Sequence, residues 1–480
     1  MDKNAPKSKN SGKKATNKKP QTQTNAKPSP NPRRVAFDVL YNVLVQGGYS
    51  NIALGNAING YSLQHRDAAF CAKIVYGVLE NLLYLNAIIA KQSKIKIDKI
   101  DEKAKILLQM GMYQLIWMNV PASAAVNETV NLAQRLKLFA AKGFINGMLR
   151  SFAPQADLYA NPAEAAPLLA KNSDEVHLVA LAYSVQPQIV KMLFNSYGKA
   201  QTTAMLAQAC GRPPLYLRVN TLKTTPQQLA KLLEEQGVRT SPVAFLSAGL
   251  VADNFGDVTQ LQAFKDGLFH IQDAASQLCC DLLCLQPGEN MLDVCAAPGG
   301  KSFTSAQKGG STATVTACDL YPHKIELITE GANRLDLCNI KSFVCNAEEN
   351  NPDFANKFDK ILCDVPCSGL GVIRRKPEIK YKTDLLSNDL PTVQYKILQT
   401  AAAYLKTGGE LVYSTCTLNP AENGEVCKKF LAEHTNFAPV LLALPQGVQR
   451  AIDEPENELT LLPHINNTDG FFAAKFVKKV

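Results

Sequence analysis

Two cysteines of this sequence lie in surroundings that suit chemistry better than packing. Cys367 belongs to the segment DVPCSGLG and Cys416 to the segment YSTCT, and each follows an apolar stretch typical of a buried strand. A thiolate is the strong nucleophile among ordinary side chains, and nearby cations or helix N-termini lower the pKa of a thiol. A lone cysteine after a strand is usually a packing residue, but two at neighbouring strand ends predict a nucleophilic site.

A turn of small residues precedes both cysteines, in the segment LDVCAAPGGKS at residues 292–302. It is neither a GxGxxG motif nor a P-loop, but the helix expected after it offers free N–H groups to a carboxylate or phosphate. Asp319 ends the next predicted strand, where an acidic side chain commonly binds ribose hydroxyls. These features favour S-adenosylmethionine as cofactor, with a purely structural turn as the alternative. The residues that leave room for it are Ala296, Ala297, Gly299 and Gly300.

A methyl donor, a thiol and an acid together suit the methylation of cytosine at C5. The C5 carbon is too weak a nucleophile to take a methyl group directly, but attack of a thiolate at C6 makes the ring enamine-like. A proton must then leave C5 and the thiol must be expelled. An acid at the N3/N4 edge of the base stabilises the adduct, and Asp364, at the end of its predicted strand, is placed for this role.

Basic residues gather in two parts of the chain. Residues 374–382 hold five Lys and Arg against Glu378, which predicts contact with a phosphate-bearing substrate or, alternatively, a solvated loop. Residues 1–34 carry eight Lys, two Arg and one Asp, a net charge of +9 that equals the charge of the whole chain. This tail has no apolar periodicity and should be disordered. It is either a non-specific phosphate contact or a solubilising extension.

The remaining composition excludes several classes of protein. Eleven of the 13 cysteines fall between Cys279 and Cys427 without any CxxC pair, and the six histidines are scattered, so we expect neither a disulfide framework nor a metal site. No apolar run reaches the roughly 18 residues that span a bilayer. The N-terminus has no secretory h-region. We therefore expect a cytoplasmic protein without membrane attachment.

The elements that must position these residues alternate between strand and helix after residue 290. Strands are expected at 290–295, 314–319, 341–345, 360–364 and 410–414, which predicts a doubly wound parallel α/β sheet. Ligands bind beyond the carboxyl ends of such strands, where the segments above lie. We expect a basic tail at 1–32, a helical domain at 33–155, a Pro/Ala-rich linker near 156–176, a small α+β module at 170–262 and the catalytic domain at 263–480.

With these motifs the chain resembles the Sun/Fmu (RsmB-type) ribosomal RNA cytosine-C5 methyltransferases, within the wider NOL/NSUN group of RNA methylases. The resemblance rests on CAAPGGK, DVPCSGLG with IRRKPEIK, and YSTCT. It extends to RVAFDVL, YGVLE and FINGMLRSF of a NusB-like RNA-binding domain, and to PPLYLRVNTLKTT and GLFHIQDAASQ of a middle module. It implies a Rossmann-like S-adenosylmethionine-dependent methyltransferase domain, acting on 16S ribosomal RNA, free or in early particles, as a monomer.

Carried over by position, the resemblance implies that Cys416 is the nucleophile, that Cys367 assists product release, and that Asp364 contacts the cytosine edge or the cofactor. The family's usual DAPCS(A/G)TG reads DVPCSGLG here, and Asn346 stands where the family often has an Asp near the adenine. Further implied cofactor contacts are Cys295, Pro298, Lys301, Asp319 and Asn346, beside the small residues of the turn. The expected RNA contacts are Arg374, Arg375, Lys376 and Lys380.

Three alternatives remain open from the sequence. A DNA cytosine methylase would usually employ the Pro-Cys thiol as nucleophile, which the Ser-Thr-Cys thiol argues against. A transfer RNA cytosine-C5 methylase has the same catalytic motifs, although the NusB-like domain favours ribosomal RNA. A non-catalytic RNA-binding assembly factor would be expected to have a decayed site, whereas both thiols, the acid and the glycine turn are intact here.

Overall fold

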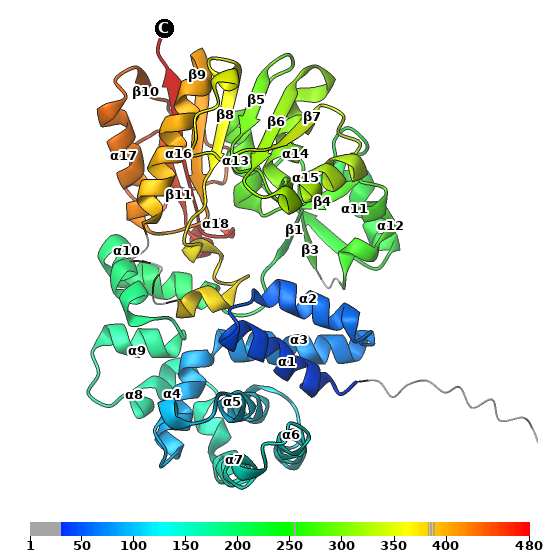
Figure 1. Cartoon of the computed structure of the whole chain (residues 1–480), viewed down its shortest axis with the longest axis vertical. Coiled ribbons are helices and arrows are strands. Elements are labelled where there is room, and N and C mark those ends of the chain that lie inside the picture. The colour runs from blue at the N-terminus through cyan, green and yellow to red at the C-terminus, as the bar shows by residue number, and fades with distance from the viewer. Residues whose placement is uncertain (1–29, 254–255, 383, 385, 387–388) are drawn as a thin grey trace, which may run out of the picture.

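The computed structural model describes residues 30–253, 256–382, 384, 386 and 389–480. The basic tail expected at 1–32 lies outside this range except for its last three residues, which lead into the first helix. In Figure 1 a helical domain lies at the bottom, the catalytic sheet at the top, and a small α+β module at the right. The fold class expected from the sequence is confirmed in all three parts.

The helical domain packs its helices around one apolar core. Asn31 caps the first helix by accepting a hydrogen bond from the Arg33 N–H, and Pro32 takes the first helical position, where its missing N–H costs nothing. Within each helix, apolar side chains recur at helical spacing and face the core. Leu40, Ile74 and Leu107, from three different helices, are buried together in this core. The helices are α1 (Pro32–Val45), α2 (Ser50–Gly60), α3 (His65–Glu80), α4 (Leu82–Gln92), α5 (Glu102–Trp117), α6 (Ala122–Arg135) and α7 (Phe139–Phe152).

The interpretation of residues 156–176 as a linker is wrong, because this stretch is helical and packed. It holds most of the 3-10 helix η2 (Ala153–Tyr159), α8 (Pro162–Leu169) and the start of α9 (Glu175–Ala182). Asn161 accepts a hydrogen bond from the Ala163 N–H at 3.2 Å, so Asn-Pro begins a helix here. α10 (Pro187–Gln208) then leads to the small module.

The small module is an antiparallel sheet with strand order β2-β3-β1-β4. Its strands are β1 (Leu215–Val219), β2 (Arg239–Pro242), β3 (Gly249–Asp253) and β4 (Phe269–Ile271), with helices α11 (Pro226–Glu235) and α12 (Gln262–Lys265). β4 lies beyond residue 262, where the sequence suggested that the catalytic domain begins. It pairs with β1, Leu217 opposite Ile271, because its buried Phe269 belongs to the core of the module.

The catalytic sheet has the order β10-β12-β9-β8-β5-β6-β7, with β11 paired to β12. The pairings from β9 through β8, β5 and β6 to β7 are parallel, whereas β12 is antiparallel to β9. The strands are β5 (Asn290–Asp293), β6 (Thr314–Asp319), β7 (Ile340–Val344), β8 (Phe358–Asp364), β9 (Leu405–Thr415), β10 (Phe437–Pro439), β11 (Glu458–Leu461) and β12 (Phe471–Lys478). The helices are α13 (Ala274–Leu283), α14 (Gly300–Gly309), α15 (Pro322–Arg334), α16 (Leu390–Tyr404), α17 (Gly424–Glu433) and α18 (Pro463–Asn466).

This topology brings the predicted site together. β8 and β9 are neighbours, with Asp364 directly opposite Ser414, so the loops that carry Cys367 and Cys416 leave the sheet side by side. β5 pairs with β8 on its other side and ends at the small-residue turn. The switch in strand order between β5 and β8 is where ligands bind in such sheets.

The segment after Cys367 also joins the catalytic domain to the helices below it. It contains the 3-10 helices η6 (Leu370–Val372) and η7 (Pro377–Tyr381). Leu370 and Ile379 share a core with α9 and α10, and Tyr381 packs against the core of the helical domain. In Figure 1 this segment is the yellow stretch between the catalytic sheet and the blue and green helices.

Within the described residues, no single helix is long and apolar enough to cross a membrane. α3 and α4 meet that criterion only as a pair, by length and composition, and they are bent by 76° relative to each other. Their apolar side chains, including Ile74, Leu79 and Ile88, form part of the core of the helical domain.

Candidate active site

The two predicted thiols lie against each other. The Sγ atoms of Cys367 and Cys416 are 3.2 Å apart, and all 13 cysteines are free. The hydrogen bond from Cys367 lowers the pKa of the Cys416 thiol, although burial opposes this, and the same contact raises the pKa of Cys367. The directions of the two shifts make Cys416 the sulfur that more readily becomes a thiolate.

A buried carboxylate that sequence reasoning missed fixes the two thiol loops to each other. Glu422 is 1% exposed, and its carboxylate accepts from the Ser368 N–H at 2.8 Å and the Ser368 hydroxyl at 2.5 Å. It also accepts from Asn419 Nδ2 at 3.0 Å and Gln394 Nε2 at 2.9 Å. Ser368 follows Cys367 directly and Asn419 lies three residues after Cys416. One side chain thus holds both loops and α16 together.

We expect Glu422→Ala to lose both stability and activity. The Ser368 N–H and Asn419 Nδ2 would remain buried without this acceptor, which costs about 3 kcal/mol in the free energy of unfolding. The thiol loops would also lose their common anchor, and a misplacement of about 1 Å lowers catalysis by about a hundredfold. Chemical denaturation and methyl transfer to RNA measure the two effects. Glu425→Ala, at an exposed position of α17, is the matched control, and equal behaviour of the two variants would contradict the prediction.

Asp364 lies in an ion pair beside the thiols. Its Oδ2 atom accepts from Lys301 Nζ at 2.6 Å, and its Oδ1 atom accepts from the Ser414 hydroxyl at 2.8 Å. Burial lowers the pKa of Lys301, but the charge and hydrogen bond of Asp364, together with Cys279 and Cys280, raise it overall, so the ammonium stays charged. The Asp364 charge raises the pKa of Cys416, and the Lys301 charge lowers it. The pair sets an anionic and a cationic group within electrostatic reach of Cys416.

The small-residue turn is shaped by its backbone contacts. The Ala296 N–H donates to the Cys318 carbonyl at 2.8 Å, and the Ala297 N–H donates to Asp319 Oδ2 at 3.2 Å. Asp319 also pairs with Lys324 Nζ at 3.2 Å. Gly299 has φ +108°, and a Cβ there would lie 2.3 Å from the ring of Phe303. Only glycine fits this position.

The residues around this turn fit S-adenosylmethionine. Asp293, at the end of β5, is 1% exposed; its Oδ2 atom accepts from the Ser302 hydroxyl at 2.7 Å. Its Oδ1 atom has no hydrogen-bond partner in the described part of the chain. An unpaired buried carboxylate oxygen is costly unless something else satisfies it. The cofactor carries a sulfonium, an ammonium and two ribose hydroxyls, and Asp293 and Asp319 supply acceptors for such groups.

Cofactor affinity should depend on pH through Asp293. Burial raises the pKa of its carboxyl group to about 7. A cationic cofactor favours the carboxylate, so binding lowers this pKa and releases a proton. Affinity should therefore rise with pH by up to about tenfold per unit below pH 7 and level off above it. Calorimetry between pH 5.5 and 8.5, a range of about three pH units around this pKa, measures the affinity for S-adenosylmethionine. Asp293→Asn should abolish the pH dependence. A flat profile for the unaltered chain would contradict the prediction.

Asn346, the expected adenine contact, lies in the loop after β7. Its Nδ2 atom donates to Glu349 Oε1 at 2.8 Å, and its Oδ1 atom accepts from the Glu348 N–H at 3.1 Å. The preceding Cys345 N–H donates to the Asp319 carbonyl at 3.0 Å, which places the loop beside Asp319. Both polar atoms of the Asn346 amide therefore already have partners within this loop, and its contact with adenine stays a prediction.

The basic residues expected to form one RNA-binding patch do not all lie on the surface. Lys380 is 2% exposed, and its ammonium donates to the carbonyls of Glu80 at 3.2 Å and Tyr183 at 3.1 Å. Burial lowers its pKa. The expectation that Lys380 belongs to an exposed patch is therefore corrected: it joins the catalytic domain to α3 and α9, and we withdraw it as an RNA contact.

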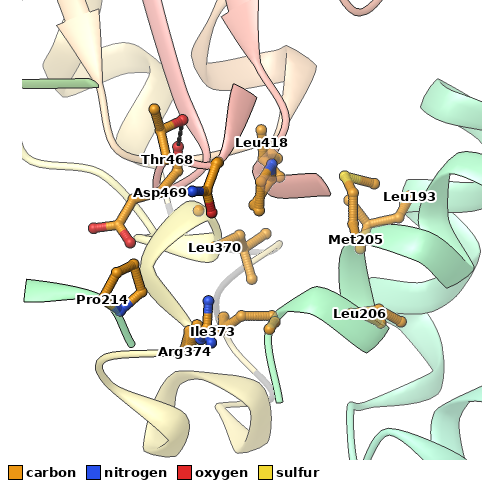
Figure 2. Close-up of a pocket in the computed structure, with 14 residues that line it drawn as sticks. Leu193, Met205, Leu206, Pro214, Leu370, Ile373, Arg374, Leu418, Thr468 and Asp469 are labelled. Atoms are coloured by element: carbon orange, nitrogen blue, oxygen red, sulfur yellow. Dashed lines mark hydrogen bonds between the residues drawn. The ribbon is translucent and has the colours of Figure 1, made fainter. Parts of the chain in front are cut away.

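The two arginines of the patch also have protein partners. Arg375 pairs with Asp469 at 2.5 Å and with Asp273 at 3.0 Å. Arg374 donates through Nη2 to the Arg212 carbonyl at 2.8 Å. Arg374 also lines a cavity of about 20 Å³. Figure 2 shows the lining residues, with Leu193 and Met205 of α10 on one side and Leu370 on the other. The cavity has room for about one water molecule, so it is a packing seam.

Comparisons with known proteins identify the family of each part of the chain. Residues 280–477 match the family 16S rRNA methyltransferase RsmB/F, residues 30–154 match the NusB family, and residues 188–259 match the RsmF/B-like ferredoxin-like domain. A probable ribosomal RNA small subunit methyltransferase B of Synechocystis sp. is 33% identical over 93% of this chain and 99% of its own length. A ribosomal RNA small subunit methyltransferase B of Pseudomonas syringae pv. tomato is 32% identical over 93% and 97%.

Solved structures share the fold. The crystal structure of PH0851 has a TM-score of 0.78 at 21% identity and covers 94% of this chain and 100% of its own. A methyltransferase homolog protein from Pyrococcus horikoshii has a TM-score of 0.56 at 28% identity, over 64% of this chain and 100% of its own. The resemblance stated from the motifs is thus confirmed: the chain belongs to the RsmB group of S-adenosylmethionine-dependent ribosomal RNA small subunit methyltransferases.

Proposed function

We propose that this enzyme methylates one cytosine of 16S ribosomal RNA at C5, through a covalent bond between Cys416 and C6 of the base. The observation that carries the proposal is the pair of free thiols 3.2 Å apart, next to the Lys301–Asp364 ion pair. Methylation at a ring nitrogen, a ribose oxygen or an exocyclic amine needs no such pair. Methylation at C5 needs one thiolate to activate the ring and a further group to assist its release.

In the proposed reaction the Cys416 thiolate attacks C6, the C5–C6 double bond opens, and its electrons make C5 nucleophilic. S-adenosylmethionine, when bound, would supply the methyl group to C5, and its sulfur would keep the electron pair of the broken S–CH3 bond. The proton on C5 then leaves to a base, the double bond re-forms, and the Cys416 thiolate departs. Cys367 lies in contact with the departing sulfur, which suits it to assist this step. Asp364 is suited to accept a hydrogen bond from the exocyclic amino group, beside the Lys301 ammonium.

The assignment of the nucleophile distinguishes this proposal from the DNA type of mechanism. In that type the thiol of the Pro-Cys segment, Cys367 here, would attack. The hydrogen bond between the thiols lowers the pKa of Cys416 and raises that of Cys367, which favours Cys416 as the nucleophile. A non-catalytic assembly factor would have no use for this arrangement.

The remaining site assignments form part of the same proposal. The turn at residues 295–301 and Asp319 would hold the cofactor, with Asn346 near its adenine. Lys376 would contact RNA phosphates, as would Arg374 and Arg375 where their protein partners leave hydrogen-bond donors free. The helical domain would hold the ribosomal RNA against the catalytic domain.

The experiment is to compare 16S ribosomal RNA from a deletion strain with RNA from strains that regain the gene. Bisulfite sequencing should show one cytosine that loses methylation on deletion and regains it with the unaltered gene but not with Cys416→Ala. Nucleoside mass spectrometry should show 5-methylcytidine as the product. A change confined to transfer RNA, or to another methylated nucleoside, would contradict the proposal.

A further inference from the structure

An exposed aromatic ring lies between two lysines where the helical domain meets the catalytic loop. Tyr49, just before α2, is 49% exposed. Lys376 Nζ lies 5.9 Å and Lys382 Nζ 5.3 Å from the centre of its ring. Both ammonium groups lie over the ring, and about half of the tyrosine surface remains exposed. The arrangement combines a half-exposed aromatic ring with two positive charges.

The position of this ring is set by the catalytic domain. The N–H of the next residue, Ser50, donates to Glu378 Oε1 at 3.1 Å, and the Ser50 hydroxyl donates to Glu378 Oε2 at 2.7 Å. Both residues are buried. Glu378 lies two residues after Lys376, so one short segment fixes the backbone beside Tyr49 and carries one of the lysines. The ring belongs to the helical domain, but its place depends on the thiol-bearing loop.

Tyr49 and the two lysines lie close to the pair of thiols. The positive charge of Lys376 helps to lower the pKa of Cys416, so the two are within electrostatic reach of each other. Figure 1 shows α2 next to the yellow segment that descends from the carboxyl ends of the catalytic strands. Lys376 thus lies between Tyr49 and the thiols, within reach of an RNA strand whose cytosine enters the site.

We propose that Tyr49, Lys376 and Lys382 bind an unpaired nucleotide that flanks the target cytosine, with its base stacked on Tyr49 and its phosphates at the two lysines. This inference rests on the proposed function for the identity of the target base. A target base that leaves its stack deprives its neighbour of a stacking partner, and an aromatic side chain can replace that partner. Aromatic rings beside positive charges are the usual means of binding single-stranded RNA.

The test separates aromatic character from bulk by comparing Tyr49→Leu with Tyr49→Phe in the full chain. Tyr49→Leu should weaken binding of a single-stranded 16S fragment containing the target by about tenfold. It should raise KM for this RNA similarly and leave kcat within about twofold, because the thiols and cofactor turn are untouched. Tyr49→Phe should match the unaltered chain. Lys382→Ala should reduce the slope of affinity against salt by about one.

Tyr61→Leu is the matched control, because Tyr61 is 43% exposed at the other end of α2 and its hydroxyl donates to Asp38. It should bind RNA normally. Equal RNA affinity of Tyr49→Leu and Tyr49→Phe would overturn the inference. Binding by fluorescence anisotropy needs no methyl transfer, so this result is distinct from failure of the proposed function, which would appear as absence of 5-methylcytidine with the unaltered enzyme.

Discussion

Cys416→Ala should be inactive and form no covalent complex with RNA, whereas Cys367→Ala should accumulate one. Without the Cys416 sulfur no bond to C6 can form, so neither methyl transfer nor trapping can follow. Without Cys367 the attack and the transfer still proceed, but release of the product loses the group that lies 3.2 Å from the departing sulfur. Both variants are incubated with 16S RNA and S-adenosylmethionine and separated on a denaturing gel.

The expected pattern is a slowly migrating protein–RNA band for Cys367→Ala alone. Cys338→Ala, which removes an exposed cysteine, is the control and should behave as the unaltered enzyme. A band from Cys416→Ala and none from Cys367→Ala would exchange the two roles and move the enzyme toward the DNA type of mechanism.

Gly299→Ala should lose S-adenosylmethionine binding, whereas Gly300→Ala should keep it. Gly299 has φ +108°, and a Cβ there would lie 2.3 Å from the Phe303 ring. This ring is buried and also fills the space beside Gly331, so it has little room to move. A strain of about 2 kcal/mol in the turn corresponds to about a thirtyfold loss of affinity. Calorimetry measures the affinity, and circular dichroism checks that the fold survives.

Gly300 is a close control because it is the next residue in the same turn. Its Cβ would meet no atom of another side chain closer than 3.8 Å, and its φ is not in the left-handed region. Equal affinities of the two variants would show that the turn tolerates a side chain at Gly299, contrary to its assignment as the cofactor cradle.

The pairing of the thiols could be predicted from the sequence because it follows from regular structure. Alternating strands and helices predict a parallel sheet, and loops at the carboxyl ends of neighbouring strands must meet. Cys367 and Cys416 are brought together simply because β8 and β9 are neighbouring strands.

The fate of the basic residues could not be predicted in this way. Lys380 and its partner Glu80 are 300 residues apart, and no local pattern distinguishes a buried interdomain lysine from an exposed one. The role of Glu422 could not be predicted either, because the four hydrogen bonds that its carboxylate accepts come from three separate segments. The prediction of a linker at residues 156–176 is wrong for a local reason. Prolines and asparagines that often mark loops also begin helices, as Asn161 and Pro162 do.

The most direct test of the central claim is release of tritium from 16S RNA that carries tritium at C5 of cytosine. The proposed chemistry exchanges this atom for the methyl group, so the unaltered enzyme with S-adenosylmethionine should release tritium in step with methyl transfer. Cys416→Ala should release none. Methyl transfer to the RNA without release of tritium would place the methyl group on another atom and contradict the account.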